Sequence, residues 1–183
     1  MILFIGVVGA GKSVQGRYLS DLLGFPWIST GEILRQHIAG ELREKMLRGD
    51  LLSDDDLYEV ITPILEELIG TTEIILDGFP RTIAQAEWLE RFIERNKSKV
   101  SCIIHLEADE DEVTERLLKR GRPDDTKEVI VNRFNEYRTK TLPIISYFEE
   151  NGAPVIHVDG NGTEQEVRER VTKAVTDLGI HKA

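Results

Sequence analysis

Cysteine, positive charge and long apolar segments are scarce in this sequence of 183 residues. Cys102 is the only cysteine, which excludes an internal disulfide and a zinc site built from several cysteines. Lysines and arginines number 23 against 33 aspartates and glutamates, so the net charge is −10 and we expect neither nucleic acid nor an anionic membrane surface as a partner. No apolar run approaches the roughly 20 residues of a membrane span. The first residues also lack the basic and apolar regions of an export signal, which predicts a cytoplasmic protein.

The few residues that could ligate a soft metal are not arranged for it in the sequence. His37, His105, His157 and His181 show none of the spacings typical of metal ligands. We expect ordinary core or surface roles for these histidines, and no zinc. Cys102 lies in the apolar run 100–104, which predicts a buried thiol rather than a nucleophile.

Short apolar runs alternate with amphipathic helical patterns along the chain. The apolar runs, each too short for a helix, lie at residues 2–5, 25–29, 73–76, 100–106 and 154–158. The helical patterns lie at residues 12–23, 54–69, 83–94, 109–119, 126–149 and 164–178. This alternation predicts an α/β fold with five parallel strands and helices on both faces. Pro143 falls inside the longest pattern and predicts a kink near Thr141, because proline lacks a backbone donor.

Residues 6–13, with the sequence GVVGAGKS, match the phosphate-binding pattern G-x-x-x-x-G-K-S/T directly after the first apolar run. The glycines allow successive N–H groups to converge on a polyphosphate, and the helix that follows adds its positive N-terminal end. Lys12 can then reach the terminal phosphates, and Ser13 can hold Mg²⁺. The sequence therefore predicts a site for a nucleoside polyphosphate.

A second motif, residues 77–82 with the sequence DGFPRT, closes the third apolar run. Ligands of an open parallel sheet bind at the carboxyl ends of its strands, so we expect this motif to lie beside the phosphate-binding loop. Asp77 is then placed to hold Mg²⁺ through water, and Arg81 to bind a second phosphate with its planar guanidinium.

Four segments taken together resemble the adenylate kinase family. They are residues 6–13, residues 28–35, residues 77–82 with Gln85, and residues 116–121. The resemblance spans nearly the whole chain, and it implies a P-loop NTPase fold and a reversible, Mg²⁺-dependent transfer of phosphate from ATP to AMP that gives two ADP. Such a transfer needs positioning and charge neutralisation more than a general base, which accounts for the many arginines.

The resemblance also implies roles for individual residues. The ATP site it implies consists of Gly9, Ala10, Gly11, Lys12, Ser13, Val14, Arg116, Arg120 and Gly162. The AMP site it implies consists of Thr30, Arg35, Asp50, Leu51, Leu52, Gly78, Phe79, Pro80, Arg81, Gln85, Arg122 and Arg133. The residues it implies for catalysis are Lys12, Arg81, Arg120, Arg122 and Arg133, with Ser13 and, through water, Asp77 at the metal. Arg116 would lie against the adenine of ATP, and Arg122 and Arg133 would hold the transferring phosphate.

The chain departs from the family in two places. Residues 29–52 resemble its monophosphate-binding arm in shortened form, and residues 120–125 leave only a stub where other members carry a zinc-binding or β-rich lid. Ser13 and Val14 stand where the family usually has glycine and threonine, which restores the wider phosphate-loop pattern. We expect residues 1–183 to form a single domain and the protein to be a monomer.

Two further functions are compatible with the sequence. Pyrimidine monophosphate kinases resemble this pattern closely but commonly carry alanine at the position of Thr30, so a UMP/CMP kinase is the first alternative. The shortened arm and stub leave a second, a nucleotide sensor that has lost transfer activity. A small-metabolite kinase is disfavoured, because residues 77–82 with Gln85 suit a nucleotide.

Overall fold

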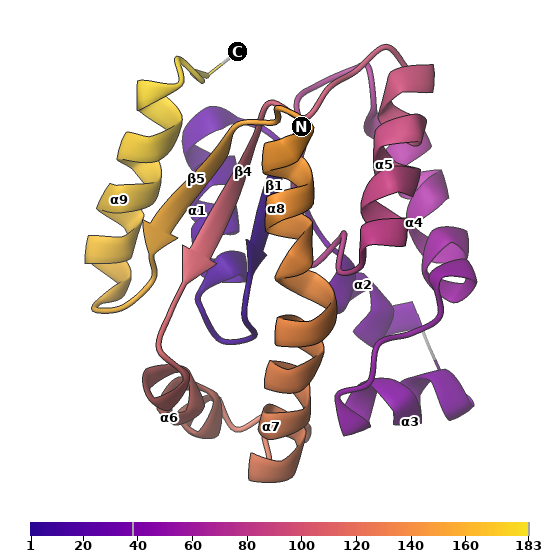
Figure 1. The fold of residues 1–183 in the computed structure, drawn as a ribbon, viewed down its shortest axis with the longest axis vertical. Helices are drawn as coiled ribbons and strands as arrows, with labels where there is room; N and C mark the ends of the chain where they lie inside the picture. The colour runs from indigo at the N-terminus through magenta and orange to yellow at the C-terminus, as the bar shows by residue number, and fades with distance from the viewer. Residues whose placement is uncertain (38, 183) are drawn as a thin grey trace.

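The computed structural model describes residues 1–37 and 39–182, and a parallel sheet lies at their centre (Figure 1). Its strands are β1 (Ile2–Gly6), β2 (Trp27–Ser29), β3 (Ile75–Asp77), β4 (Cys102–Glu107) and β5 (Val155–Asp159). They lie in the order β2-β3-β1-β4-β5, and every neighbouring pair is parallel. The predicted five-stranded parallel sheet is confirmed.

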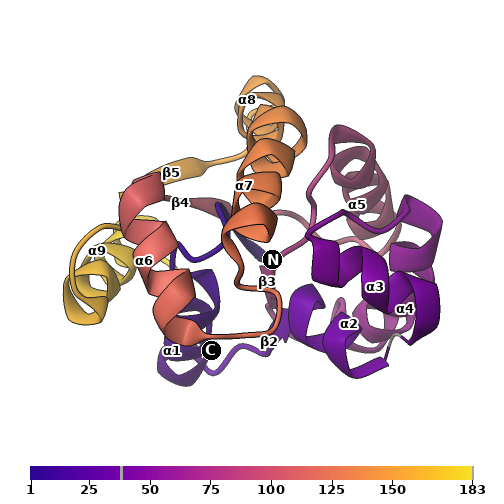
Figure 2. The same ribbon diagram turned by 90° about the horizontal axis from the view of Figure 1, so that it is seen from below.

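Helices cover both faces of the sheet. They are α1 (Lys12–Leu23), α2 (Thr30–His37), α3 (Gly40–Arg48), α4 (Asp54–Leu68), α5 (Ile83–Arg95), α6 (Glu110–Arg120), α7 (Lys127–Glu136), α8 (Pro143–Glu150) and α9 (Glu164–Asp177). Figure 2 shows α7 and α8 on one side of β4 and β5 and α1 on the other. Among the described residues, none of these helices combines the length and apolar character needed to cross a membrane.

Successive residues of β1 enter two separate hydrophobic cores. Leu3 and Ile5 pack in one core with buried residues of α4, α5 and α8. Ile2 and Phe4 pack in the other with residues of α1 and α9. Side chains alternate between the faces of a strand, so a strand covered on both sides is apolar throughout, as β1 is.

The long helical pattern at residues 126–149 divides where Pro143 predicted a break. A π-helical turn, Tyr137–Thr141, follows α7, and α8 begins with Pro143 at its first position. The N–H of Leu142 donates to the carbonyl of Tyr137 at 2.7 Å, which is the five-residue spacing of a π turn. The α-helix is therefore divided near Thr141, where Pro143 predicted a kink or a division.

The arm predicted at residues 29–52 contains two short helices, α2 and α3. None of the residues of α3 is buried, so this helix contributes little to either core. Asn132 of α7 donates its side-chain amide to the carbonyl of Arg48 and to the carboxylate of Asp50, both at 3.1 Å. These two bonds join the end of α3 to α7.

Candidate active site

A cavity of about 460 Å³ opens at the carboxyl ends of β1 and β3, a volume within the range of small-molecule sites. Its lining includes nearly all of the residues that the sequence analysis singled out: Gly9, Ala10, Gly11, Lys12, Ser13, Val14, Thr30, Arg35, Asp50, Leu51, Leu52, Asp77, Gly78, Pro80, Arg81, Gln85, Arg116, Arg120, Arg122, Arg133 and Gly162. Segments separated by more than a hundred residues therefore meet in one space.

Phe79 is the exception among the predicted residues. It is fully buried, and its ring packs edge-on against Tyr58 and Trp88 rather than facing the cavity. Its side chain supports the loop that carries its neighbours Gly78 and Pro80, both of which line the cavity.

The phosphate-binding loop wraps around the side chain of Lys12. Lys12 Nζ donates to the carbonyls of Gly6 and Val7 at 2.7 and 2.8 Å. Gly9 has a φ of 83°, and a Cβ there would come within 2.8 Å of Val113, so the position requires glycine. Burial lowers the pKa of Lys12 to about 8, although the nearby charge of Asp77 acts in the opposite direction.

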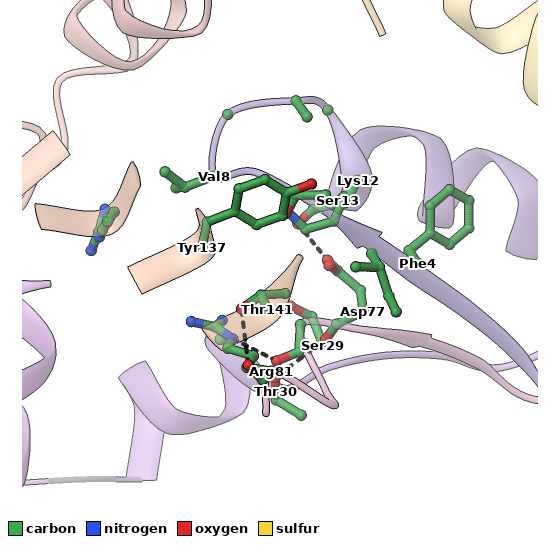
Figure 3. A pocket seen from close by; sticks show the side chains of 18 of the residues that line it. Phe4, Val8, Lys12, Ser13, Ser29, Thr30, Asp77, Arg81, Tyr137 and Thr141 are labelled. Atoms are coloured by element: carbon green, nitrogen blue, oxygen red, sulfur yellow. Dashed lines mark hydrogen bonds between the residues drawn. The ribbon is translucent and has the colours of Figure 1, made fainter. Parts of the chain in front are cut away.

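Ser13 and Asp77 meet behind this loop. Ser13 Oγ donates to Asp77 Oδ2 at 2.7 Å (Figure 3), and Asp77 is only 3% exposed. A hydroxyl and a carboxylate side by side are oxygen ligands of the kind that Mg²⁺ prefers. The donor set therefore suits Mg²⁺ better than a metal that seeks nitrogen or sulfur.

The end of β3 holds Arg81 in a fixed position beside the loop. Arg81 Nε donates to the carbonyl of Gly78 at 2.7 Å, and the Thr141 hydroxyl donates to the carbonyl of Arg81 at 3.0 Å (Figure 3). Gly78 has a φ of 84°, and a Cβ there would meet Thr30 Oγ1 at 2.8 Å. Burial lowers the pKa of Arg81, with the charge of Asp77 opposing that effect. The guanidinium is thus a desolvated cation facing a cavity.

Gln85 lies deeper on the same side. Its Oε1 accepts from the N–H of Arg81 and its Nε2 donates to Asp54 Oδ1, both at 2.7 Å. These two contacts fix the orientation of the amide. Oε1 can accept one more hydrogen bond and Nε2 can donate one more. The amide can therefore recognise a nucleotide base whose edge both donates and accepts hydrogen bonds.

On the other side of the cavity, two aspartates hold two arginines. Arg120 binds Asp125 in a bidentate pair at 2.9 and 2.6 Å, and Arg133 pairs with Asp124. Burial by itself would raise the pKa of Asp125, but the hydrogen bonds from the side chain of Arg120 and the N–H of Arg122 hold it below its usual value. Asp125 is therefore a fully ionised anchor that fixes the arginines.

Arg116 connects α6 to the loop after β5. Its guanidinium donates to the carbonyls of Gly160 and Gly162, both at 2.9 Å, and pairs with Glu112. The flat group is thus held at the rim of the cavity, where it can lie against a ring. Arg35 of α2 also lines the cavity, and its pKa is lowered by burial and then by the charge of Arg122.

Several residues at the site carry no sequence signal. Asp54, Tyr137 and Thr141 belong to no motif, yet Asp54 orients Gln85, and Tyr137 and Thr141 line the cavity. Figure 3 shows the Tyr137 ring directed toward Lys12 and Ser13. Asp54, Tyr137 and Thr141 could be found only by knowing how α4 and the π turn pack around the segment that follows β3.

The structure also bears on the cysteine and the histidines. Cys102 is fully buried and burial raises its pKa to about 12, so the predicted buried thiol is confirmed. His105 and His157 lie side by side on neighbouring strands, and together with Glu107 they bring three possible ligand atoms close to one another.

Comparison with known proteins agrees with this geometry. A family model described as adenylate kinase matches residues 4–153. The chain is 41% identical over 189 residues to the adenylate kinase of Thermus thermophilus, with 98% of this chain and 97% of that protein covered. It is 38% identical over 181 residues to the adenylate kinase of Parasynechococcus marenigrum, with 96% and 98% covered. It is 37% identical over 180 residues to that of Nocardia farcinica, with 95% and 98% covered.

Proposed function

The chain belongs to the adenylate kinase family, and we infer that it has the activity that this membership implies. It is a phosphotransferase that moves a phosphoryl group between ATP and AMP, with two ADP as the product. The observation that carries this conclusion is the match to adenylate kinases along almost the whole chain, including every segment that lines the cavity. Neither the relatives nor the cavity favours the UMP/CMP kinase or the sensor.

We propose that the two nucleotides enter the cavity from opposite sides and meet at Lys12. ATP lies on the phosphate-binding loop with its base near Arg116 and Gly162. AMP lies between the arm and β3, where Thr30 and Gln85 contact its base and Arg35 and Arg81 its phosphate. This assignment is supported by the two sets of residues lining opposite parts of one continuous space.

The transferring phosphate then lies among five cations: Lys12, Arg81, Arg120, Arg122 and Arg133. Phosphoryl transfer spreads negative charge over the equatorial oxygens, and fixed cations stabilise that charge without reorganising. In the free protein Arg120 and Arg133 are already held by Asp125 and Asp124. Each guanidinium has five N–H donors, so it can bind a phosphate while keeping its aspartate.

Mg²⁺ would be held by Ser13 and, through water, by Asp77, whose oxygens lie 2.7 Å apart. When bound, the ion neutralises part of the charge on the β- and γ-phosphates and fixes their orientation. Ser13 would turn its hydroxyl from Asp77 toward the ion. No zinc is needed for this chemistry.

We further propose an organisation in which residues 1–183 form one domain, residues 29–52 serve as a reduced AMP arm and residues 120–125 as a lid stub. We propose a cytoplasmic monomer that binds neither nucleic acid nor membranes. The exposed large apolar side chains of the described residues support the monomer, because they are scattered over α1, α3, α5, α6, α7, the residue before α8 and the residue after α9.

A coupled assay with ATP and each monophosphate tests the function. We expect ADP formation with AMP, and a kcat/KM at least about tenfold lower with UMP or CMP, because a wrong base leaves a buried amide unpaired. Lys12→Met should lower kcat about 100-fold or more. Lys173→Met on α9, whose ammonium pairs with Asp177 away from the cavity, is the matched control and should leave kcat unchanged.

Two outcomes would contradict these assignments. Product formed only with UMP or CMP would show that the protein is a pyrimidine monophosphate kinase. ATP binding without product for any monophosphate would make the protein a sensor.

A further inference from the structure

A second group of polar side chains lies on the face of the sheet covered by α8, at β4 and β5. His105 and His157 are register partners on the two strands, and Glu107 lies two residues after His105. Residues two apart share a face of a strand, so all three side chains point to the same side. His105 is 3% exposed, whereas Glu107 and His157 are 54% and 45% exposed. The group is thus closed to solvent at His105 and open to solvent at Glu107 and His157.

Three ligand atoms converge in this group. His105 Nδ1 lies 3.3 Å from His157 Nδ1, Glu107 Oε1 lies 3.1 Å from His157 Nδ1, and it lies 3.5 Å from His105 Nδ1. An ion that binds such atoms at about 2.0–2.1 Å in tetrahedral geometry holds them about 3.3–3.4 Å apart. The triangle therefore has nearly the dimensions of one face of a zinc site.

The Nε2 atoms of both imidazole rings already have hydrogen-bond partners. His157 Nε2 lies 3.2 Å from Glu149 Oε1, and His105 Nε2 lies 2.7 Å from the hydroxyl of Tyr137. A carboxylate only accepts, so His157 donates from Nε2, and a neutral His157 then carries its lone pair on Nδ1. The same tautomer of His105, donating to Tyr137, turns a second lone pair toward the carboxylate of Glu107. Ligating histidines typically donate their other N–H to just such partners.

Three lone pairs that face one another repel unless a metal ion or a proton lies between them. We propose that His105, His157 and Glu107 bind a divalent transition-metal ion of the zinc type, with a water molecule as the fourth ligand. Two imidazoles and a carboxylate are a zinc ligand set, whereas Mg²⁺ and Ca²⁺ favour oxygen alone. The half-exposed Glu107 and His157 leave the fourth position open to solvent. This site would depart from the expectation of no zinc, which rested on the histidine spacing, the single cysteine and the short segment at residues 120–125.

A proton is the natural competitor of the metal. Burial lowers the pKa of His105, while Glu107 and Glu149 raise it and the charges of His157 and Lys12 lower it further. Hydrogen bonds that the protonated His157 donates to Glu149 and Glu107 raise its pKa. The proton therefore occupies His157 first, and binding of the metal releases it. Affinity should rise with pH as His157 loses its proton.

The test uses the full chain, stripped with a chelator and free of nucleotide, titrated with Zn²⁺ alone by calorimetry and with Co²⁺ alone by visible absorption. We expect one equivalent to bind at pH 8, with the intense bands of four-coordinate Co²⁺ and at least tenfold weaker binding at pH 6. His157→Asn and Glu107→Gln should each weaken binding about 100-fold, and Glu149→Gln about tenfold. His181→Asn, at an exposed histidine outside the group, should bind as the wild type does.

Folding does not confound these variants, because His157 and Glu107 lie half in solvent, and far-UV circular dichroism of the metal-free proteins checks this directly. Absence of saturable binding at pH 8 would overturn the site and leave a protonated His157 between two carboxylates. Wild-type affinity in His157→Asn and Glu107→Gln would equally overturn it. The bands of six-coordinate Co²⁺ would also overturn it, since they would point to the oxygen ligands Ser13 and Asp77.

Discussion

At the scale of single residues, the site is built from cations that already have partners. Lys12 is held by two backbone carbonyls, Arg81 by the carbonyl of Gly78, and Arg120 by Asp125. These contacts keep each charge in place before a substrate arrives, so little conformational entropy is lost on binding. Their cost is desolvation, which is visible in the lowered pKa values of Lys12 and Arg81.

Lys12 gives a prediction for the pH dependence of ATP binding. Its pKa is lowered to about 8 in the free protein, chiefly by burial, whereas bound phosphates favour the charged form and raise it. The contribution of Lys12 to affinity is therefore complete below pH 8 and decreases as the pH rises above it. We expect the Kd for ATP to be about tenfold weaker at pH 9 than at pH 7, measured calorimetrically without AMP.

Lys12→Met is the control for this titration, since its weaker ATP binding should change little between pH 7 and pH 9. Calorimetry in buffers of different ionisation enthalpy should show proton uptake by the wild type near pH 8.5 and none by the variant. Equal pH profiles for the two proteins would show that Lys12 does not titrate in this range.

At the scale of elements, the short segment after α6 is arranged by one aspartate. The carboxylate of Asp125 accepts hydrogen bonds from the side chain of Arg120 and from the backbone N–H of Arg122, the latter at 3.0 Å. The backbone of Arg122 is thereby fixed while its side chain stays in the cavity lining. Six residues, 120–125, thus present two arginines without the support of a larger lid.

Arg122→Ala tests whether this stub takes part in transfer. The variant keeps the backbone N–H that Asp125 binds, so the loop should retain its shape while one cation is lost. We expect kcat at saturating substrates to decrease about 100-fold, and the Kd for AMP in the absence of ATP to change less than about threefold. Lys119→Ala, at an exposed neighbour on α6 whose ammonium contacts Glu115, should change neither. An unchanged kcat in Arg122→Ala would remove Arg122 from the catalytic set.

Some bounds of the helices could be predicted from the sequence, and others could not. The bounds of α1 match the pattern at residues 12–23, because its apolar stripe and its flanking glycines are both local signals. The break before Pro143 was predictable for the same reason. The π turn before it was not, because its register depends on the contacts of Tyr137 with His105 of β4 and of Thr141 with the carbonyl of Arg81 after β3.

Some residues of the cavity were likewise predictable from the sequence, and others were not. Lys12, Ser13, Asp77 and Arg81 were predictable, because the contiguous motifs that contain them follow strands and parallel strands end at one edge. Asp54 was not, since its contact with Gln85 joins the starts of α4 and α5. The pairing of His105 with His157 depends on the register of β4 with β5, which spacing along the chain does not encode.

At the scale of the whole molecule, the two proposed substrate regions lie on different parts of the chain. The arm comprises α2 and α3, and the opposite wall comprises α6 and the loop after β5 (Figure 2). Asn132 of α7 contacts Arg48 and Asp50 at the end of the arm, and α7 also carries Arg133. A ligand that reaches from one wall to the other should therefore order both at once.

Hydrogen exchange with a linked dinucleoside polyphosphate tests this arrangement. ATP alone should slow exchange mainly in residues 9–14 and 116–125, and AMP alone mainly in residues 39–52 and 78–85. The linked ligand should slow all four segments, because it contacts both walls and binding suppresses local opening in proportion to saturation. Residues 168–177 of α9, none of which lines the cavity, are the internal control and should exchange at the same rate throughout. Protection of only one wall by the linked ligand would mean that the two substrate regions do not face each other across the cavity.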